Sequence, residues 1–142
     1  MTFDNKLEAM IVRHEGIKLR PYPCPAGKMT IGVGRNLEDN GITKEEALMM
    51  MRHDILLAFG ELSAHVPIFS QLSTARQSVL IDMHFNLGLP RLLKFEKMLE
   101  AVDSLDFEKV ASEMLNSTWA KQVKGRAVEL AEMMVSGEFQ DA

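Results

Sequence analysis

The sequence is poor in cysteine, in aromatic residues and in long apolar runs. A single cysteine among 142 residues excludes an internal disulfide bond. Aromatic residues make up 6% of the chain while methionine occurs 11 times, so we expect a core of methionine and aliphatic side chains. The apolar runs are too short to span a bilayer, and residues 1–6 lack the basic and apolar segments of a signal peptide. The chain is therefore expected to begin in the cytoplasm, without stable insertion into a membrane.

Charge and composition exclude further classes of protein. The 16 basic and 20 acidic residues give a net charge of −4, which argues against nucleic acid as a partner. Hydrophobic residues at 46% and charged residues at 25% are typical of a single globular domain of this length. The four histidines and the cysteine show no metal-ligand spacing, so neither a metal nor another cofactor is expected.

The first forty residues predict a helix followed by a small β-hairpin. Apolar residues, Phe3 included, recur at helical spacing over residues 3–14, and a glycine then ends the pattern. Prolines and glycines become frequent after this point, which disfavours helix. Two short β-prone stretches, 18–22 and 29–33, are joined by a Pro/Gly turn and predict the hairpin. Glycines at positions 32 and 34 indicate a bend or a close approach of the backbone to a ligand.

The rest of the chain predicts helices only. Thr43, followed three residues later by Glu46, forms a capping box that opens a long helix. A second helix begins at Ser73 or Thr74 and stops at Gly88. Its candidate core residues are Val79, Leu80, Met83 and Phe85. Shorter helices are expected over residues 91–101, 106–115 and 125–135.

These patterns predict an α+β fold that is mostly helical and has two lobes. A small β-hairpin lobe and a helical lobe would be joined by the long helix. Two lobes joined in this way leave a cleft between them, and ligands bind in clefts of this kind.

Three polar residues near the start have a suggestive spacing: Glu15, then Cys24 after eight residues, then Thr30 after five more. A carboxyl that is partly removed from water has a raised pKa and serves as a general acid, whereas position alone favours a solvated helix-end glutamate. Thr30 either holds a water opposite Glu15 or is an ordinary strand residue. Cys24 lies in a stiff turn near Arg20 and Lys28, and is either an activated thiol or a free loop cysteine.

Together these residues resemble the phage-type lysozymes of glycoside hydrolase family 24. The catalytic hairpin of that family has Glu, eight residues, Asp, five residues, Thr, and then an Ile-Gly-hydrophobic-Gly run. Later segments are similar to the family's central helix and to its late Trp and Asn-Arg-Ala segments. The matching positions are Glu15-Gly16-Ile17-Lys18-Leu19-Arg20, Tyr22, Gly27, Thr30-Ile31-Gly32-Val33-Gly34, Arg76 to Gly88, Ser117-Thr118-Trp119 and Gly125-Arg126-Ala127. The resemblance therefore covers nearly the whole chain.

The resemblance implies one lysozyme domain over residues 1–142, with an active-site cleft between two lobes. Its β-hairpin lobe would span about residues 15–42 and its connecting helix about 43–66. The helical lobe would comprise about residues 67–142 together with the N-terminal helix, 1–14. Such a muramidase cleaves the β-1,4 bond between N-acetylmuramic acid and N-acetylglucosamine in peptidoglycan.

The family pattern also implies roles for individual residues. Glu15 would be the general acid that protonates the glycosidic oxygen, and Thr30 would help to place the attacking water. Arg126 falls where the family has an arginine paired with the catalytic glutamate, so it would orient Glu15. The implied saccharide-binding residues are Arg35, Asn36 and Phe85, of which Arg35 stands where the T-even phage enzyme has a histidine.

Cys24 departs from the family pattern, because it occupies the position of the catalytic aspartate. In one interpretation the thiol or thiolate takes over the aspartate's work and steadies the water together with Thr30. In a second, the thiolate attacks the anomeric carbon, and in a third Cys24 is dispensable. The preserved spacing favours the first interpretation, in which Cys24 is a catalytic residue beside Glu15 and Thr30.

The leading functional hypothesis is an endolysin of phage or prophage origin. It would act as a monomer on peptidoglycan glycan strands, and would wait in the host cytoplasm until a holin released it to the cell wall. A lytic transglycosylase is an alternative, although a water-holding threonine argues against it. A non-catalytic peptidoglycan-binding protein is another, since the usual aspartate is missing.

Overall fold

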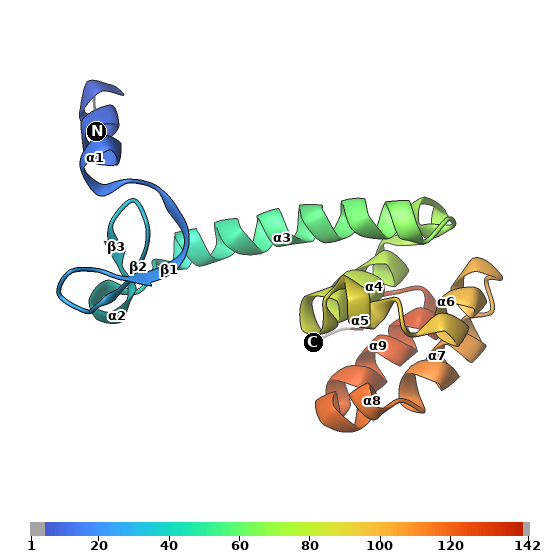
Figure 1. Ribbon diagram of the computed structural model, residues 1–142. Coiled ribbons are helices and arrows are strands. Elements are labelled where there is room, and N and C mark those ends of the chain that lie inside the picture. Colours follow the sequence, from blue (N-terminus) through green and yellow to red (C-terminus); the bar gives the residue numbers. More distant parts are fainter. Residues whose placement is uncertain (1–4, 141–142) are drawn as a thin grey trace. The chain divides into compact units, whose positions relative to one another are not determined.

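The structure, a computed structural model, describes residues 5–140. The chain divides into two compact units, Met1–Met50 and Met51–Ala142, which we call the N-unit and the C-unit and describe separately. Helix α3, Lys44–His65, begins in the first and ends in the second (Figure 1). Within residues 5–140, no helix combines the length and the apolar character needed to cross a bilayer.

The N-unit contains a small antiparallel sheet with the strand order β1-β2-β3. Its elements are α1 (Asn5–Glu15), β1 (Lys18–Pro23), β2 (Met29–Gly32), β3 (Arg35–Asn36) and α2 (Leu37–Asn40) (Figure 1). The predicted N-terminal helix is confirmed from residue 5 onwards, while Phe3 lies outside the described residues. The predicted hairpin is confirmed as β1 and β2, which pair Tyr22 with Thr30.

The third strand and α2 are not predicted by the sequence pattern. β3 is only two residues long, too short to show the alternation by which a strand is recognised. It pairs with β2 because the intervening turn reverses the chain, with φ of +69° at Gly32 and +70° at Gly34. Glycine adopts such left-handed conformations without steric cost, so the bend expected at these glycines is confirmed.

The predicted capping box opens α3. The Glu46 backbone N–H donates to Thr43 Oγ1 at 3.1 Å, and the Thr43 N–H donates to Glu46 Oε1 at 2.9 Å. Arg35 adds two hydrogen bonds to the same carboxylate, of 2.8 and 2.7 Å, and a third of 3.2 Å to the carbonyl oxygen of Gly41. The short strand β3 is thereby fastened to the first turn of α3.

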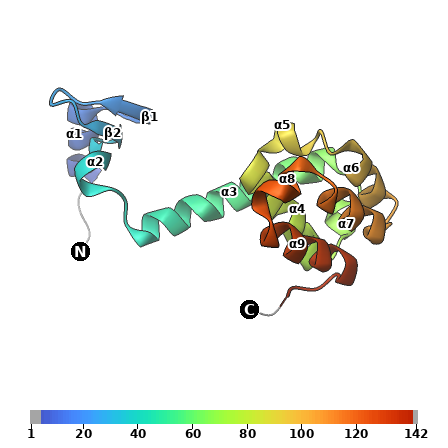
Figure 2. The ribbon, with the colours of Figure 1, turned by 90° about the horizontal axis from the view of Figure 1, so that it is seen from below.

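In the part of the C-unit that the structure describes, up to residue 140, all regular elements are helices. After α3 it contains the 3-10 helix η1 (Phe69–Gln71), α4 (Thr74–Leu87), α5 (Leu89–Leu92), α6 (Glu96–Asp103), α7 (Phe107–Leu115), α8 (Thr118–Val123) and α9 (Gly125–Ser136). Helix α4 lies among the later helices (Figure 2). The helices expected near residues 74–88, 106–115 and 125–135 are confirmed as α4, α7 and α9, while α8 was not expected.

The single helix expected over residues 91–101 is wrong, because α5 and α6 are separate helices. Phe95 has φ −78° and ψ 57°, which is outside the helical region. Its ring packs edge-on against Trp119, with 6.2 Å between ring centroids. This contact joins residues 24 positions apart along the chain, so the local periodicity of the segment does not reveal the break.

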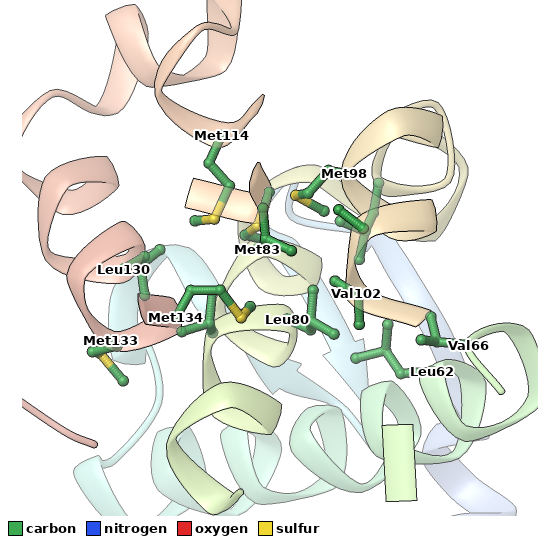
Figure 3. Packing of buried hydrophobic residues seen from close by; sticks show 14 of the residues in the cluster. Leu62, Val66, Leu80, Met83, Met98, Val102, Met114, Leu130, Met133 and Met134 are labelled. Atoms are coloured by element: carbon green, nitrogen blue, oxygen red, sulfur yellow. The ribbon is translucent and has the colours of Figure 1, made fainter. Parts of the chain in front are cut away.

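The core of the C-unit is rich in methionine, as the composition predicts. Met83, Met98, Met114 and Met134 are buried from four different helices and point into the same cluster (Figure 3). Val79 and Leu80 are also fully buried, as expected, but Phe85 remains 43% exposed and is not a core residue. Phe85 lies two positions after Met83 in α4, which turns its side chain away from the face that Met83 buries.

The C-terminal end of α9 is held by Arg76 of α4. The guanidinium donates through Nε to Met134 O at 2.8 Å and through Nη2 to Val135 O at 3.0 Å. It also lies 3.5 Å above the ring of Phe107. These bonds occupy carbonyl oxygens that the end of a helix leaves without intrahelical donors. Gly137 follows with φ +74°, the left-handed conformation of a helix C-cap.

We predict that Gly137→Ala destabilises the C-unit by about 1–2 kcal/mol, because the left-handed backbone disfavours a side chain. The new Cβ would also lie 3.1 Å from Arg76 Cζ. Gly60→Ala is the matched control, since Gly60 is inside α3 and has open space around it. It should stabilise the protein by roughly 0.5–1 kcal/mol. Urea unfolding followed by the fluorescence of Trp119 measures both, and equal midpoints for the two variants would contradict the prediction.

The Arg35–Glu46 pair predicts a pH-dependent stability of the N-unit. Hydrogen bonds from Arg35, and then from the Thr43 backbone, lower the pKa of Glu46 from 4.5 to about 2. A carboxyl with a lowered folded-state pKa contributes stability that is fully present above its unfolded pKa. This contribution is lost as the pH falls from about 4.5 towards 2.

Amide hydrogen exchange of β2 and β3, expressed as protection factors, measures this loss. Protection in the wild type should fall between pH 4.5 and 2.5, whereas Glu46→Gln should begin lower and change less. Glu45→Gln, on the preceding residue of the same helix, should keep the wild-type dependence. The prediction is wrong if Glu46→Gln and Glu45→Gln give the same pH profile.

Candidate active site

Glu15 is the last residue of α1, and its carboxyl lies against the turn between β2 and β3. A Cβ atom added to Gly34 would stand 2.7 Å from Glu15 Oε2 and 2.9 Å from Cδ. The atoms close to Gly34 thus belong to the Glu15 side chain, whereas the approach of a ligand to these glycines stays a prediction. The Glu15 side chain is exposed.

Cys24 and Thr30 lie together at the other end of β2. The Cys24 N–H donates to Lys28 O at 2.9 Å and the Gly27 N–H donates to Cys24 O at 2.7 Å, which closes the turn between β1 and β2. Thr30 is 3% exposed, and its hydroxyl donates to Lys28 O at 2.8 Å. The eight- and five-residue spacings thus bring a thiol beside a buried hydroxyl.

The turn lowers the pKa of the Cys24 thiol below its ordinary value. Hydrogen bonds from the backbone of Lys28, and then of Ala26, stabilise the thiolate and outweigh the opposing effect of burial. The Thr30 hydroxyl adds a smaller contribution of the same sign. In the sequence, nearby basic side chains were the expected cause of an activated thiol. In the structure, the main cause of the lowered thiol pKa is the backbone of the turn.

Thr30 has one hydroxyl hydrogen and two possible acceptors for it. Lys28 O accepts it at 2.8 Å, so a hydrogen bond to the Cys24 sulfur requires the hydroxyl to rotate. A thiolate is the stronger acceptor because it carries a full negative charge. The protonation state of Cys24 and the orientation of the Thr30 hydroxyl are therefore coupled.

Arg35 and Asn36 are both engaged within the N-unit. Arg35 binds Glu46, and Asn36 is the N-cap of α2, where its Oδ1 accepts from the Asp39 N–H at 3.1 Å. The Asn36 amide also donates to Asp39 Oδ2 at 3.0 Å. These contacts hold the segment that follows the glycine turn, so any contact of Arg35 or Asn36 with a saccharide would come in addition to a structural role.

Arg126 and Phe85 lie in the C-unit at one pocket of about 320 Å³. Its other lining residues are Met51, Ile55, Ser78, Ile81 and Asp82. Arg126 pairs with Asp82, with Nη2 2.7 Å and Nε 2.8 Å from the same carboxylate oxygen. The sequence pattern gives Asp82 no role, because only the packing of α9 on α4 brings it to Arg126.

The structure therefore groups the candidate residues by unit. Glu15, Cys24 and Thr30 lie in the N-unit with Arg35 and Asn36, whereas Arg126 and Phe85 lie in the C-unit. The pairing of Arg126 with Glu15, and the substrate contacts of Arg35, Asn36 and Phe85, stay predictions.

Known proteins match the chain across both units. Residues 12–132 match the family model described as phage lysozyme. The chain is 28% identical to the pre-baseplate central spike protein Gp5 of Enterobacteria phage T4, over 92% of this chain and 28% of that protein. It is 24% identical to the probable T4-type lysozyme 1 of Dictyostelium discoideum, over 94% and 95% of the two chains. It is 27% identical to an endolysin of Acyrthosiphon pisum secondary endosymbiont phage 1, over 92% and 88%.

These matches agree with the arrangement of the fold. The chain spans little more than a quarter of the spike protein but nearly the full length of the lysozyme and most of the endolysin. The matched region contains the Glu15–Cys24–Thr30 spacing of the N-unit and Arg126 of the C-unit. A mostly helical chain with one small antiparallel sheet, carrying these residues, belongs to the phage lysozyme family.

Proposed function

We propose that the protein is an endolysin that hydrolyses the β-1,4 bond between N-acetylmuramic acid and N-acetylglucosamine. Membership of the phage lysozyme family makes it a glycosidase-type enzyme with peptidoglycan as its substrate. The observation that carries the finer proposal is the contact of Cys24 with Thr30, beside one another at the base of β2. Two polar groups in this arrangement suit the binding of one water.

The hydrogen-bond geometry supports a division of work between the two residues. The Thr30 hydroxyl donates either to Lys28 O or to the Cys24 sulfur, and in both orientations its oxygen keeps a lone pair that accepts a hydrogen bond from the water. The Cys24 thiolate, stabilised by the backbone of the turn, accepts the second one. A lone pair of the water then faces the anomeric carbon. As the water attacks, its proton passes to the Cys24 sulfur, and Glu15 gives its own proton to the departing glycosidic oxygen.

Gly34 supports the position of the general acid. Its lack of a side chain leaves room for the Glu15 carboxyl, which any larger residue would displace. Arg126 is proposed to orient Glu15. Asp82 occupies its Nε and Nη2, whereas Nη1 makes no hydrogen bond to the part of the chain that the structure describes, and is left for a second carboxylate.

The remaining candidate residues are proposed to bind the saccharide. The exposed ring of Phe85 suits stacking on a sugar face, with Arg35 and Asn36 as polar contacts.

The protein is proposed to act as a monomer, because all of the proposed residues come from one chain. Release from the host cytoplasm to the cell wall is proposed to depend on a holin. Attack by water, as opposed to formation of an anhydro sugar, follows from the water-binding pair.

We predict that Glu15→Gln abolishes activity, because the amide has no proton to give to the leaving oxygen; a loss of at least ~100-fold is expected. Cys24→Asp should stay active, because a carboxylate also accepts the proton of the water. The activity of Cys24→Ala should lie between the activities of these two variants. The measurement is lysis of chloroform-treated bacteria together with mass spectrometry of the muropeptides, whose products should carry one added water.

Two results would contradict these assignments. Undiminished lysis by Cys24→Ala would show that the thiol takes no part in the mechanism. Anhydro products would show that the reaction is a transglycosylation and not a hydrolysis. A product of retained β-configuration would exclude direct attack by water.

We also predict that Gly34→Ala lowers activity by about 100-fold, since misplacing a catalytic group by an ångström has an effect of this size. Gly32→Ala is the matched control. Its φ of +69° equals that of Gly34 within one degree, but no atom lies within 4 Å of the added Cβ. Both variants therefore place a side chain at the same positive φ, and only Gly34→Ala displaces Glu15. Turbidity assays at equal folded concentration compare them, and equal losses would disprove the positioning role of Gly34.

A further inference from the structure

Arg126 stands at a position where a cation does not stabilise its own helix. It lies in the first turn of α9, and that turn contains no acidic residue. The backbone N–H groups at the start of a helix carry a partial positive charge, which favours acidic side chains there and disfavours basic ones. The stability of α9 therefore does not explain Arg126, whose charge needs a partner from another element.

The backbone that carries Arg126 is held by the junction between α8 and α9. Lys124 has φ +51° and ψ −114°, a conformation that residues with a side chain rarely adopt. Its N–H donates to Ala120 O at 2.8 Å, and its carbonyl oxygen accepts from the Ala127 N–H at 2.9 Å. The start of α9 is thus fixed, whereas the arginine side chain has several rotatable bonds that the backbone does not fix.

Asp82 of α4 fixes the direction of the guanidinium of Arg126. Its Oδ1 accepts from Nε at 2.8 Å and lies 2.7 Å from Nη2, while its carbonyl oxygen lies 3.4 Å from Nη2. A guanidinium is planar and rigid, so contacts along one edge restrict both its position and its plane. Nη1 therefore faces away from Asp82, and it donates no hydrogen bond within residues 5–140.

Asp82 also balances the charge of Arg126. The pocket of about 320 Å³ at which both residues lie is lined by this one acidic and this one basic side chain together with neutral ones. An unbalanced guanidinium beside a carboxyl group favours its ionised form, which is the opposite of what a general acid requires. A guanidinium paired with a carboxylate donates a hydrogen bond from the same place without adding a net positive charge.

We propose that Asp82 is a positioning residue of the active site, which aims Nη1 of Arg126 and balances the charge of the guanidinium. This role rests on the proposed pairing of Arg126 with Glu15, because Asp82 acts through Arg126 and not on the substrate. It assigns to α4 a part in catalysis besides the saccharide contact proposed for Phe85.

Steady-state kinetics on soluble, uncross-linked peptidoglycan strands, with the release of reducing ends as the signal, test this role at equal folded concentration. Asp82→Ala should lower kcat by about 10- to 100-fold with little change in KM, because a misdirected donor affects the reacting groups and not the binding of the saccharide. Asp82→Asn keeps an acceptor oxygen and should recover part of this loss. Glu61→Gln is the matched control, since it removes the carboxylate of another ion pair of the C-unit, 2.9 Å from His84 Nε2, and should keep the wild-type kcat.

A double-mutant cycle separates an action through Arg126 from any other action of Asp82. Arg126→Ala should lower kcat at least as much as Asp82→Ala does, and the double variant should be no slower than Arg126→Ala alone. The proposal is overturned if either single variant keeps the wild-type kcat, or if Asp82→Ala slows Arg126→Ala further. In these cases the wild type still hydrolyses peptidoglycan, whereas a wild type that releases no reducing ends contradicts the proposed function itself.

Discussion

The turn at residues 32–34 is the constraint on which the N-unit depends. Two glycines with left-handed backbone reverse the chain within three residues and start β3 beside β2. Arg35 can then reach Glu46 at the beginning of α3, which fixes the sheet to that helix. The same turn leaves the space in which the Glu15 carboxyl lies. Strand pairing, helix attachment and the position of the candidate acid therefore all follow from one backbone conformation.

The cysteine at the expected aspartate position has an environment that suits a negative charge. A carboxylate would be charged at neutral pH without help, whereas a thiol needs stabilisation of its thiolate. The turn supplies this through the backbone of Lys28 and Ala26, and Thr30 adds to it. The backbone groups would be present with any side chain at position 24. The hairpin is thus compatible with either residue as an acceptor for the proton of a water.

The C-unit combines a tightly packed interior with two different surfaces. Met83, Met98, Met114 and Met134 fill the space between four helices, and unbranched, flexible side chains suit such a site. One surface carries Arg126, Asp82 and the exposed Phe85 around a pocket. A second hollow lies between α7 and α9, and the buried Ala111 and Ala131 that line it lie outside the core cluster.

Local pattern determined much of this protein. Apolar periodicity, the capping box at Thr43 and Glu46, and the Pro/Gly segment were enough for α3, α4, α7, α9 and the β1–β2 hairpin, because these elements depend on neighbouring residues. The spacing of Glu15, Cys24 and Thr30 was likewise visible, as was its likeness to a lysozyme family.

Only the tertiary structure decided the features that join distant parts of the chain. The helix is interrupted at Phe95, whose ring packs on Trp119. Strand β3 forms because the turn at residues 32–34 places Arg35 and Asn36 beside β2. Arg126 of α9 binds Asp82 of α4. The lowering of the Cys24 thiol pKa likewise comes chiefly from the backbone of a folded turn, not from the charged side chains nearby in sequence. Each of these depends on distances between residues that sequence separation does not specify, which is why they appear only once the chain is folded.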